Sequence, residues 1–213
     1  MTNLSYFLFL MITGTFCYGL NDVVKKKVLN VLNPVFLLGI VWTGAGLLLL
    51  ALSLVLDAAG PKPGFWQAFA ITFTAGLISQ ILVWSSFAKE EASLMSPLRL
   101  ITPPIVLVTG FFFLAEKPSI FGIIGVLITF IGLWWLLNGQ ARFRQISFKD
   151  ILKNKGVLFG ISGSVIVGFS FPFDKKAVLF SSSLFYSWVL LLSIGLVTLI
   201  WAYLKYKKQL FLL

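Results

Sequence analysis

The sequence predicts an all-α fold: a polytopic helical membrane protein with about seven transmembrane helices. The chain is 59% hydrophobic and 11% charged, whereas a soluble domain carries about 25% charged residues. Seven apolar segments approach or exceed the roughly 20 residues that cross a bilayer, and lysines and arginines cluster at their ends. The segments are too long and too evenly apolar for barrel strands, so the need for internal backbone hydrogen bonds in lipid favours helices.

The seven expected helices cover residues 4–24, 34–55, 65–88, 96–115, 120–137, 156–173 and 182–204. The first ends at Lys25-Lys26-Lys27 and lacks the basic start and cleavage site of a signal peptide, so we expect it to be retained. The second carries no charge and leads into a turn rich in Gly and Pro at residues 57–64. The third ends at Lys89-Glu90-Glu91.

The fourth and fifth expected helices meet at the short turn Glu116-Lys117-Pro118. Arg99 lies inside the start of the fourth helix, where a charge costs roughly 2.5–3.5 kcal/mol and must face protein or water. In the fifth helix, Gly125 and Gly132 are seven residues apart and share one face. Small residues on one face allow helices to approach closely, so we expect this face to be packed, either within the five-helix half or between subunits.

A basic linker at residues 139–155 divides the chain. Its charged residues are Arg142, Arg144, Lys149, Lys153, Lys155 and the single acid Asp150. Two more helices follow, and they end at Asp174-Lys175-Lys176 and at Lys205, Lys207 and Lys208. The predicted organisation is therefore a five-helix unit (residues 1–138), the linker, and a two-helix unit (residues 156–213).

The chain resembles itself at an offset of 149 residues. The matched positions are Gly14 with Gly163, Gly19 with Gly168, Lys26-Lys27 with Lys175-Lys176, Phe36 with Phe185, and Gly46 with Gly195. The offset contains five helices, and because five is odd the second copy enters the membrane from the opposite side. Such inverted repeats build many secondary transporters. We expect one complete half and an incomplete second half, truncated after the seventh helix, with three helices missing.

Several short stretches carry a family resemblance. They are Ser85-Ser86-Phe87-Ala88, Ala92-Ser93-Leu94, Pro103 or Pro104, Phe113-Leu114-Ala115-Glu116, and Gly125 with Gly132. Together with the repeat, they make the chain similar to the EamA family of the drug/metabolite transporter superfamily, over residues 14–137 and in part over 163–204. The resemblance implies ten helices in two inverted halves around a central cavity. It also implies a multi-pass protein of the cell (plasma or inner) membrane that carries small metabolites.

The chain departs from the family pattern at two points. Family members often carry a basic residue in the second helix, whereas this region reads Val41-Trp42-Thr43-Gly44. The related small multidrug resistance proteins use a carboxylate inside the first helix to couple protons to cationic drugs. Residues 4–20 contain no Asp or Glu, so proton-coupled export of cationic drugs is not expected.

The candidate substrate-binding residues are Arg99, Thr102, Asn21, Gln80 and Trp42. Arg99 would anchor an anion or a carbonyl group in the cavity; alternatively it reaches the lipid head groups or pairs with Glu90 or Glu91. Thr102 lies one turn further along, on a similar face. The polar Asn21, its neighbour Asp22 and Gln80 either line the cavity or bond a neighbouring helix. The tryptophan either forms a cavity wall or packs in the core.

Other function classes are excluded by composition. The chain has no histidine and one cysteine, Cys17, so it can form neither an internal disulfide nor a multi-Cys/His metal cluster. We expect no cofactor and no enzyme activity, because no intramembrane carboxylate pair or serine–base constellation is present. The net charge of +10 is concentrated at helix ends, which indicates a lipid bilayer and not nucleic acid as the partner.

The expected function is that of a secondary transporter that moves a small polar or anionic metabolite by alternating access. Its partners would be the bilayer and a small-molecule substrate, and a homodimer could supply the cavity wall that the missing helices leave open. The alternative is a non-transporting membrane fragment or scaffold of the same family.

Overall fold

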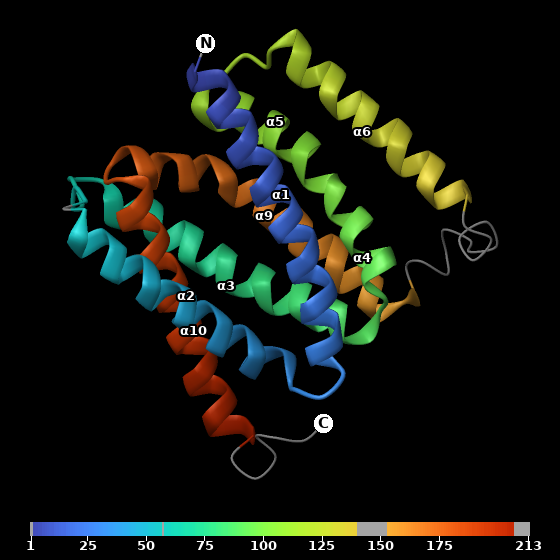
Figure 1. The fold of residues 1–213 in the computed structure, drawn as a ribbon, viewed down its shortest axis with the longest axis horizontal. Coiled ribbons are helices and arrows are strands. Elements are labelled where there is room, and N and C mark those ends of the chain that lie inside the picture. The colour runs from blue at the N-terminus through green and yellow to red at the C-terminus, as the bar shows by residue number, and fades with distance from the viewer. Residues whose placement is uncertain (1, 57, 140–152, 207–213) are drawn as a thin grey trace.

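The structure is a computed structural model that describes residues 2–56, 58–139 and 153–206. Its elements in chain order are α1 (Thr2–Leu29), α2 (Pro34–Val55), α3 (Phe65–Lys89), α4 (Ala92–Leu98), the 3-10 turn η1 (Arg99–Ile101), α5 (Thr102–Leu114), α6 (Ile120–Gly139), α9 (Lys155–Leu179) and α10 (Ser183–Tyr206) (Figure 1). Within these residues, six helical segments are long and apolar enough to cross a membrane, and α6 adds a shorter apolar helix. The predicted polytopic all-α fold class is confirmed.

Side chains and turns set several helix ends. Asn33 caps α2 by accepting a hydrogen bond from the Val35 N–H (2.9 Å), and Pro34 suits the first helical position because its missing N–H would be unpaired there. Asn154 caps α9 in the same way. Before α3, Gly64 has a φ of 94°, a left-handed conformation that glycine adopts without strain.

The pair α2 and α10 forms one half of the packed centre. A Cβ placed on Gly46 would lie 2.7 Å from Leu192 Cγ, and one placed on Gly195 would lie 2.5 Å from the Thr43 nitrogen. At an offset of 149, Gly46 corresponds to Gly195 and Thr43 to Leu192, so each contact is the counterpart of the other. Residue numbers rise along one helix as they fall along the other, and the two helices therefore cross antiparallel about a local two-fold axis.

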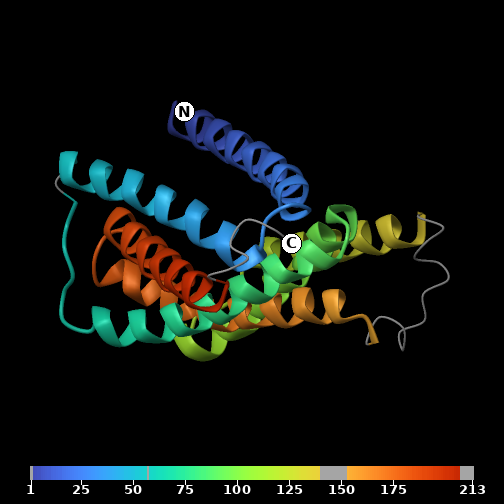
Figure 2. The same ribbon diagram turned by 90° about the horizontal axis from the view of Figure 1, so that it is seen from below.

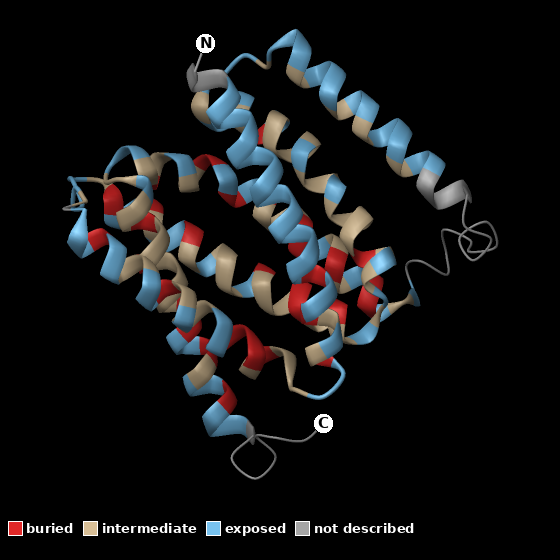
Figure 3. Cartoon of the chain, in the orientation of Figure 1, coloured by how far each residue is buried: buried red, intermediate tan, exposed pale blue. Residues whose placement is uncertain are grey.

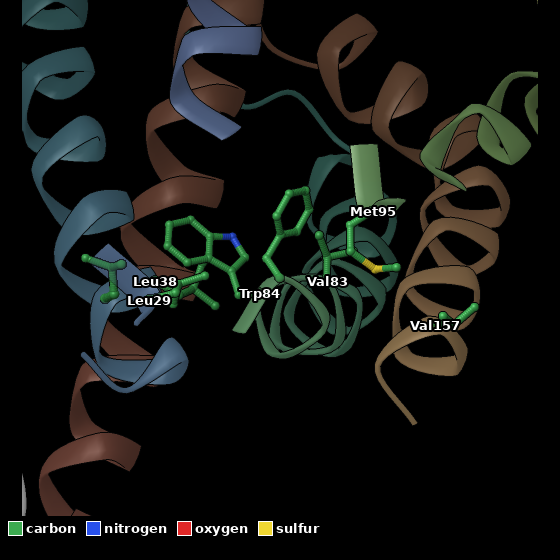
Figure 4. Close-up of a cluster of buried hydrophobic side chains, with 8 residues drawn as sticks. Leu29, Leu38, Val83, Trp84, Met95 and Val157 are labelled. Atoms are coloured by element: carbon green, nitrogen blue, oxygen red, sulfur yellow. The ribbon is translucent and has the colours of Figure 1, made fainter. Parts of the chain in front are cut away.

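The pair α3 and α9 forms the other half. Ser79 Oγ donates a hydrogen bond to the Gly163 carbonyl (3.0 Å), which requires the two backbones to lie close together. Where the C-terminal end of α3 meets the N-terminal end of α9, a buried apolar cluster contains side chains from α1, α2, α3, α4 and α9. Its labelled members are Leu29, Leu38, Val83, Trp84, Met95 and Val157 (Figure 4).

Helices α1 and α6 lie on the outside of this centre. Figure 2 shows α1 on one face of the bundle, outside the other helices, and Figure 3 shows how little of either helix is buried. All residues from 5 to 21 are exposed, and burial in α1 begins at Asp22. On α6, Gly125 and Gly132 have no neighbouring atom within 4 Å of a Cβ position. Packing of this glycine face within the half does not occur in the described part of the chain, and its packing between subunits stays a prediction.

Two expected boundaries differ from the structure. The first helix continues through the three lysines to Leu29, so Lys25 lies within it and not after it. The fourth apolar segment begins at Ala92 and is interrupted by η1 between α4 and α5. Most of the predicted linker, residues 140–152, lies outside the described residues.

Candidate functional site

A polar cavity of about 470 Å³ lies between α1, α3, the η1–α5 junction and α9. Its lining residues are Thr15, Tyr18, Gly19, Asp22, Gln80, Val83, Ser96, Arg99, Leu100, Thr102, Pro103, Ser164 and Val167. A larger cavity of about 750 Å³ between α5, α6 and α9 is lined almost wholly by apolar side chains. Of these two, the smaller cavity offers the charged and polar groups that could orient a polar solute. A third cavity of about 380 Å³, at the turn between α5 and α6, is lined in part by Glu116, Lys117 and Lys175.

The interruption at η1 brings Arg99 to the cavity. Pro97 sits inside α4, and Pro103 and Pro104 follow at the start of α5. Proline has no N–H to donate, so the regular helical hydrogen-bond pattern cannot continue through this segment. The Thr102 N–H instead bonds to the Arg99 carbonyl, three residues back. The three prolines thus interrupt the regular helix at Arg99.

Three charged residues meet beside the cavity, and we call Asp22, Lys25 and Arg99 the charged triad. Lys25 Nζ lies 2.5 Å from Asp22 Oδ1, while Arg99 Nη1 lies 3.6 Å from the same oxygen. The other carboxylate oxygen, Oδ2, accepts a hydrogen bond from Ser96 Oγ (2.9 Å). Arg99 Nη2 also donates to the Tyr18 hydroxyl. The triad joins α1 to η1 and carries one net positive charge, and Ser96 adds a link from Asp22 to α4.

Lys25 lies behind the cavity and does not line it. Its side chain is 4% exposed, and Nζ lies 3.9 Å from the centre of the Phe87 ring and 5.4 Å from that of Trp84. Aromatic faces attract cations, especially where water is excluded. The next residue, Lys26, donates to the Phe87 carbonyl in the last turn of α3 (2.9 Å), where the helix dipole also favours a cation. These contacts fix the C-terminal end of α1.

Three of the five predicted site residues come together in this cavity: Arg99, Thr102 and Gln80. Thr102 also donates a hydrogen bond to the Ser164 carbonyl of α9 (3.2 Å). Asn21 is exposed on α1 and does not line the cavity. Trp42 packs against the buried apolar cluster and lies outside the cavity too, as the core-packing alternative for this residue supposed.

Sequence reasoning gave Asp22 too little weight and did not single out Lys25 or Tyr18 as site residues. It ended the first helix at residue 24, which left the lysine outside the bilayer. The available signal was the spacing of Asp22 and Lys25, because residues three apart share a helix face. The alternative interpretation of Arg99 has it pair with Glu90 or Glu91 or reach the head groups, whereas its carboxylate partner in the structure is Asp22. Its role as an anchor for an anion or a carbonyl group stays a prediction.

Comparison with known families gives one match. The family described as the EamA-like transporter family matches residues 5–138, more than half of the chain. The matched segment holds every cavity-lining residue except Ser164 and Val167. No curated protein and no solved structure matches the chain.

Proposed function

Because the chain belongs to the EamA-like transporter family, we propose that it is a secondary transporter that carries a small polar or anionic metabolite across the cell (plasma or inner) membrane by alternating access. Members of this family are membrane transporters and not enzymes. Six long apolar helices among the described residues agree with a multi-pass membrane protein. The polar cavity is the proposed substrate site.

One observation carries the proposal: charged and polar side chains converge on a cavity inside an otherwise apolar bundle. A charge within hydrocarbon is costly and faces protein or water. Asp22 and Arg99 both belong to helical segments long enough to cross a bilayer, and both line the same cavity. An ion pair that only held helices together would need no cavity of about 470 Å³ beside it, a volume within the range of small-molecule sites.

The cavity walls come from both units of the chain, which is the arrangement alternating access requires. Helices α1, α3 and α5 belong to the first unit, and α9 to the second. Helix α1 is anchored near its C-terminal end through Lys26 and the charged triad, while its residues 5–21 are exposed. A tilt of α1 about this anchored end would open the cavity toward one side of the membrane.

Solute uptake into proteoliposomes tests the proposal. The purified chain should accelerate entry of at least one solute from a panel of labelled anionic and neutral metabolites, relative to protein-free vesicles. Arg99→Gln should reduce that rate without reducing the amount of protein inserted. The matched control is Lys62→Gln, which removes a lysine in the exposed loop before α3. If no solute enters faster than in empty vesicles, the alternative of a non-transporting scaffold is favoured.

A further inference from the structure

We propose that the polar cavity binds a small hydroxylated monocarboxylate, with Arg99 as the anchor of its carboxylate. This inference rests on the proposed function, because it names the substrate class of the same cavity. Three properties of the cavity lead to this inference. They are the net charge of the cavity, the Arg99 N–H groups that can donate to a ligand, and the direction of the hydrogen bonds that the cavity hydroxyls make.

The net charge of the site calls for one negative charge. Lys25 and Asp22 form a close pair at 2.5 Å, and both side chains are almost fully enclosed, so together they are neutral. Arg99 stands further from the carboxylate, at 3.6 Å, beyond hydrogen-bonding range. One positive charge is left over inside a membrane bundle, where an uncompensated charge is costly. A single ligand anion neutralises it, whereas a dianion or a phosphate ester would overcompensate.

Arg99 also has the geometry to hold a carboxylate. Its side chain is 26% exposed and borders the cavity. A guanidinium carries five N–H donors, and among the described residues its one hydrogen-bond partner is the Tyr18 hydroxyl. The remaining donors form a planar fork that matches the two oxygens of a carboxylate. The lysine of the triad cannot compete for the ligand, because it lies behind the cavity wall.

Three of the cavity hydroxyls indicate a hydrogen-bond donor on the ligand; the Tyr18 hydroxyl, which accepts from Arg99, is not one of them. Thr15 donates to the Met11 carbonyl (2.8 Å), Thr102 to the Ser164 carbonyl (3.2 Å), and Ser164 to the Gly160 carbonyl (2.8 Å). Each hydroxyl has one hydrogen and two acceptor positions, so with its hydrogen committed it can only accept from a ligand. A ligand hydroxyl supplies that donor. An ammonium group would donate as well, but it would cancel the negative charge that the site requires.

Calorimetric binding to the purified full chain tests this inference with a matched set of probes. Lactate has one carboxylate and one hydroxyl; propionate lacks the hydroxyl, lactamide lacks the charge, malate adds a carboxylate, and alanine replaces the hydroxyl with an ammonium group. Lactate should bind most tightly. Loss of one charge-assisted hydrogen bond changes affinity by about tenfold or more, so lactamide, malate and alanine should each bind at least about tenfold more weakly, with propionate in between.

Charge variants separate the role of net charge from a merely structural role. Lys25→Gln lets Asp22 pair with Arg99, which makes the site neutral and should abolish lactate binding. Adding Asp22→Asn to Lys25→Gln restores one positive charge and should restore lactate binding. A merely structural role predicts the opposite, because the second substitution removes another native side chain. Arg99→Lys keeps the charge but loses the fork and should weaken lactate about tenfold. Lys62→Gln, the loop control, should change nothing.

The outcomes can be told apart from those of the transport assay. Equal affinity for lactate, lactamide and malate, or no lactate binding at all, would overturn the substrate class. The substrate class is also refuted if the double variant binds lactate no better than Lys25→Gln while melting at the same temperature. Lactate binding without accelerated uptake of lactate or of any other solute in the panel would leave the ligand class standing and refute the transporter. Uptake of other solutes without lactate binding would support the transporter and refute the substrate class.

Discussion

The crossing of α2 and α10 offers the sharpest test of the packing. In Gly46→Ala, the new Cβ would lie 2.7 Å from Leu192 Cγ and 2.8 Å from the Leu192 backbone nitrogen. Carbon atoms in contact prefer a separation of about 3.5–4.0 Å. Because one of the crowded atoms belongs to the backbone, a rotamer change cannot relieve the overlap, and the two helices must move apart.

The size of the effect follows from two opposing contributions. Replacing a helical glycine with alanine gains about 0.8–1.0 kcal/mol of helix propensity, while overpacking a close contact costs about 1–3 kcal/mol. Gly44 lies two residues away in the same helix, and a Cβ there meets nothing within 4 Å. The propensity gain is shared by both variants, so the difference between Gly44→Ala and Gly46→Ala isolates the overpacking cost of about 1–3 kcal/mol.

The assay is reversible unfolding in detergent, followed by helical circular dichroism. We expect Gly44→Ala to be at least as stable as the parent chain and Gly46→Ala to be less stable. Gly195→Ala should behave like Gly46→Ala, because its Cβ would lie 2.5 Å from the Thr43 nitrogen in the counterpart contact. If Gly46→Ala proved as stable as Gly44→Ala, the close antiparallel crossing would be refuted.

Three further predictions concern single polar contacts. Ser79→Ala removes the hydroxyl that donates to the α9 backbone and should lower the free energy of unfolding by about 0.5–1.5 kcal/mol. The control Thr74→Val removes a hydroxyl that bonds only within its own exposed helical turn and should cost less. Lys26→Met removes the bond to the last turn of α3 and should speed hydrogen exchange at residues 22–29, whereas Lys27→Met, at an exposed position, should not. Lys175→Gln breaks an exposed ion pair to the acidic turn before α6 and should lower stability by less than about 1 kcal/mol; a larger loss would show that this pair is shielded from solvent.

The sequence sufficed to place the helices, because lipid leaves a spanning segment no other way to pair its backbone groups. Length and hydropathy therefore located six long helical segments and the shorter α6. The same reasoning predicted that Arg99 faces protein or water, since a charge inside an apolar span is costly, and in the structure Arg99 borders the polar cavity. Both predictions rest on the cost of moving polar groups into hydrocarbon, which is large and independent of the details of packing.

The face that each helix turns toward its neighbours could not be predicted from length and hydropathy. Asn21 and Asp22 are neighbours in the sequence, yet successive residues in a helix point about 100° apart, and the structure leaves Asn21 exposed and Asp22 buried. Their roles therefore depend on which side of α1 meets α3 and α4. The end of α1 was misjudged for a related reason: Lys25 remains within the helix because Asp22 neutralises it, a pairing that hydropathy does not register.

The two central helix pairs also have a consequence for biosynthesis. Leu192, which packs against Gly46, is made almost 150 residues later, and at roughly 5–20 residues per second the ribosome needs about 7 to 30 s to reach it. During this interval α2 and α3 are already in the membrane without α10 and α9, the helices they pack against most extensively. Packing of the first helices is therefore completed only when α9 and α10 have been made. A nascent chain released before that point would expose the grooves at Gly39 and Gly46 to other membrane proteins and to quality-control proteases.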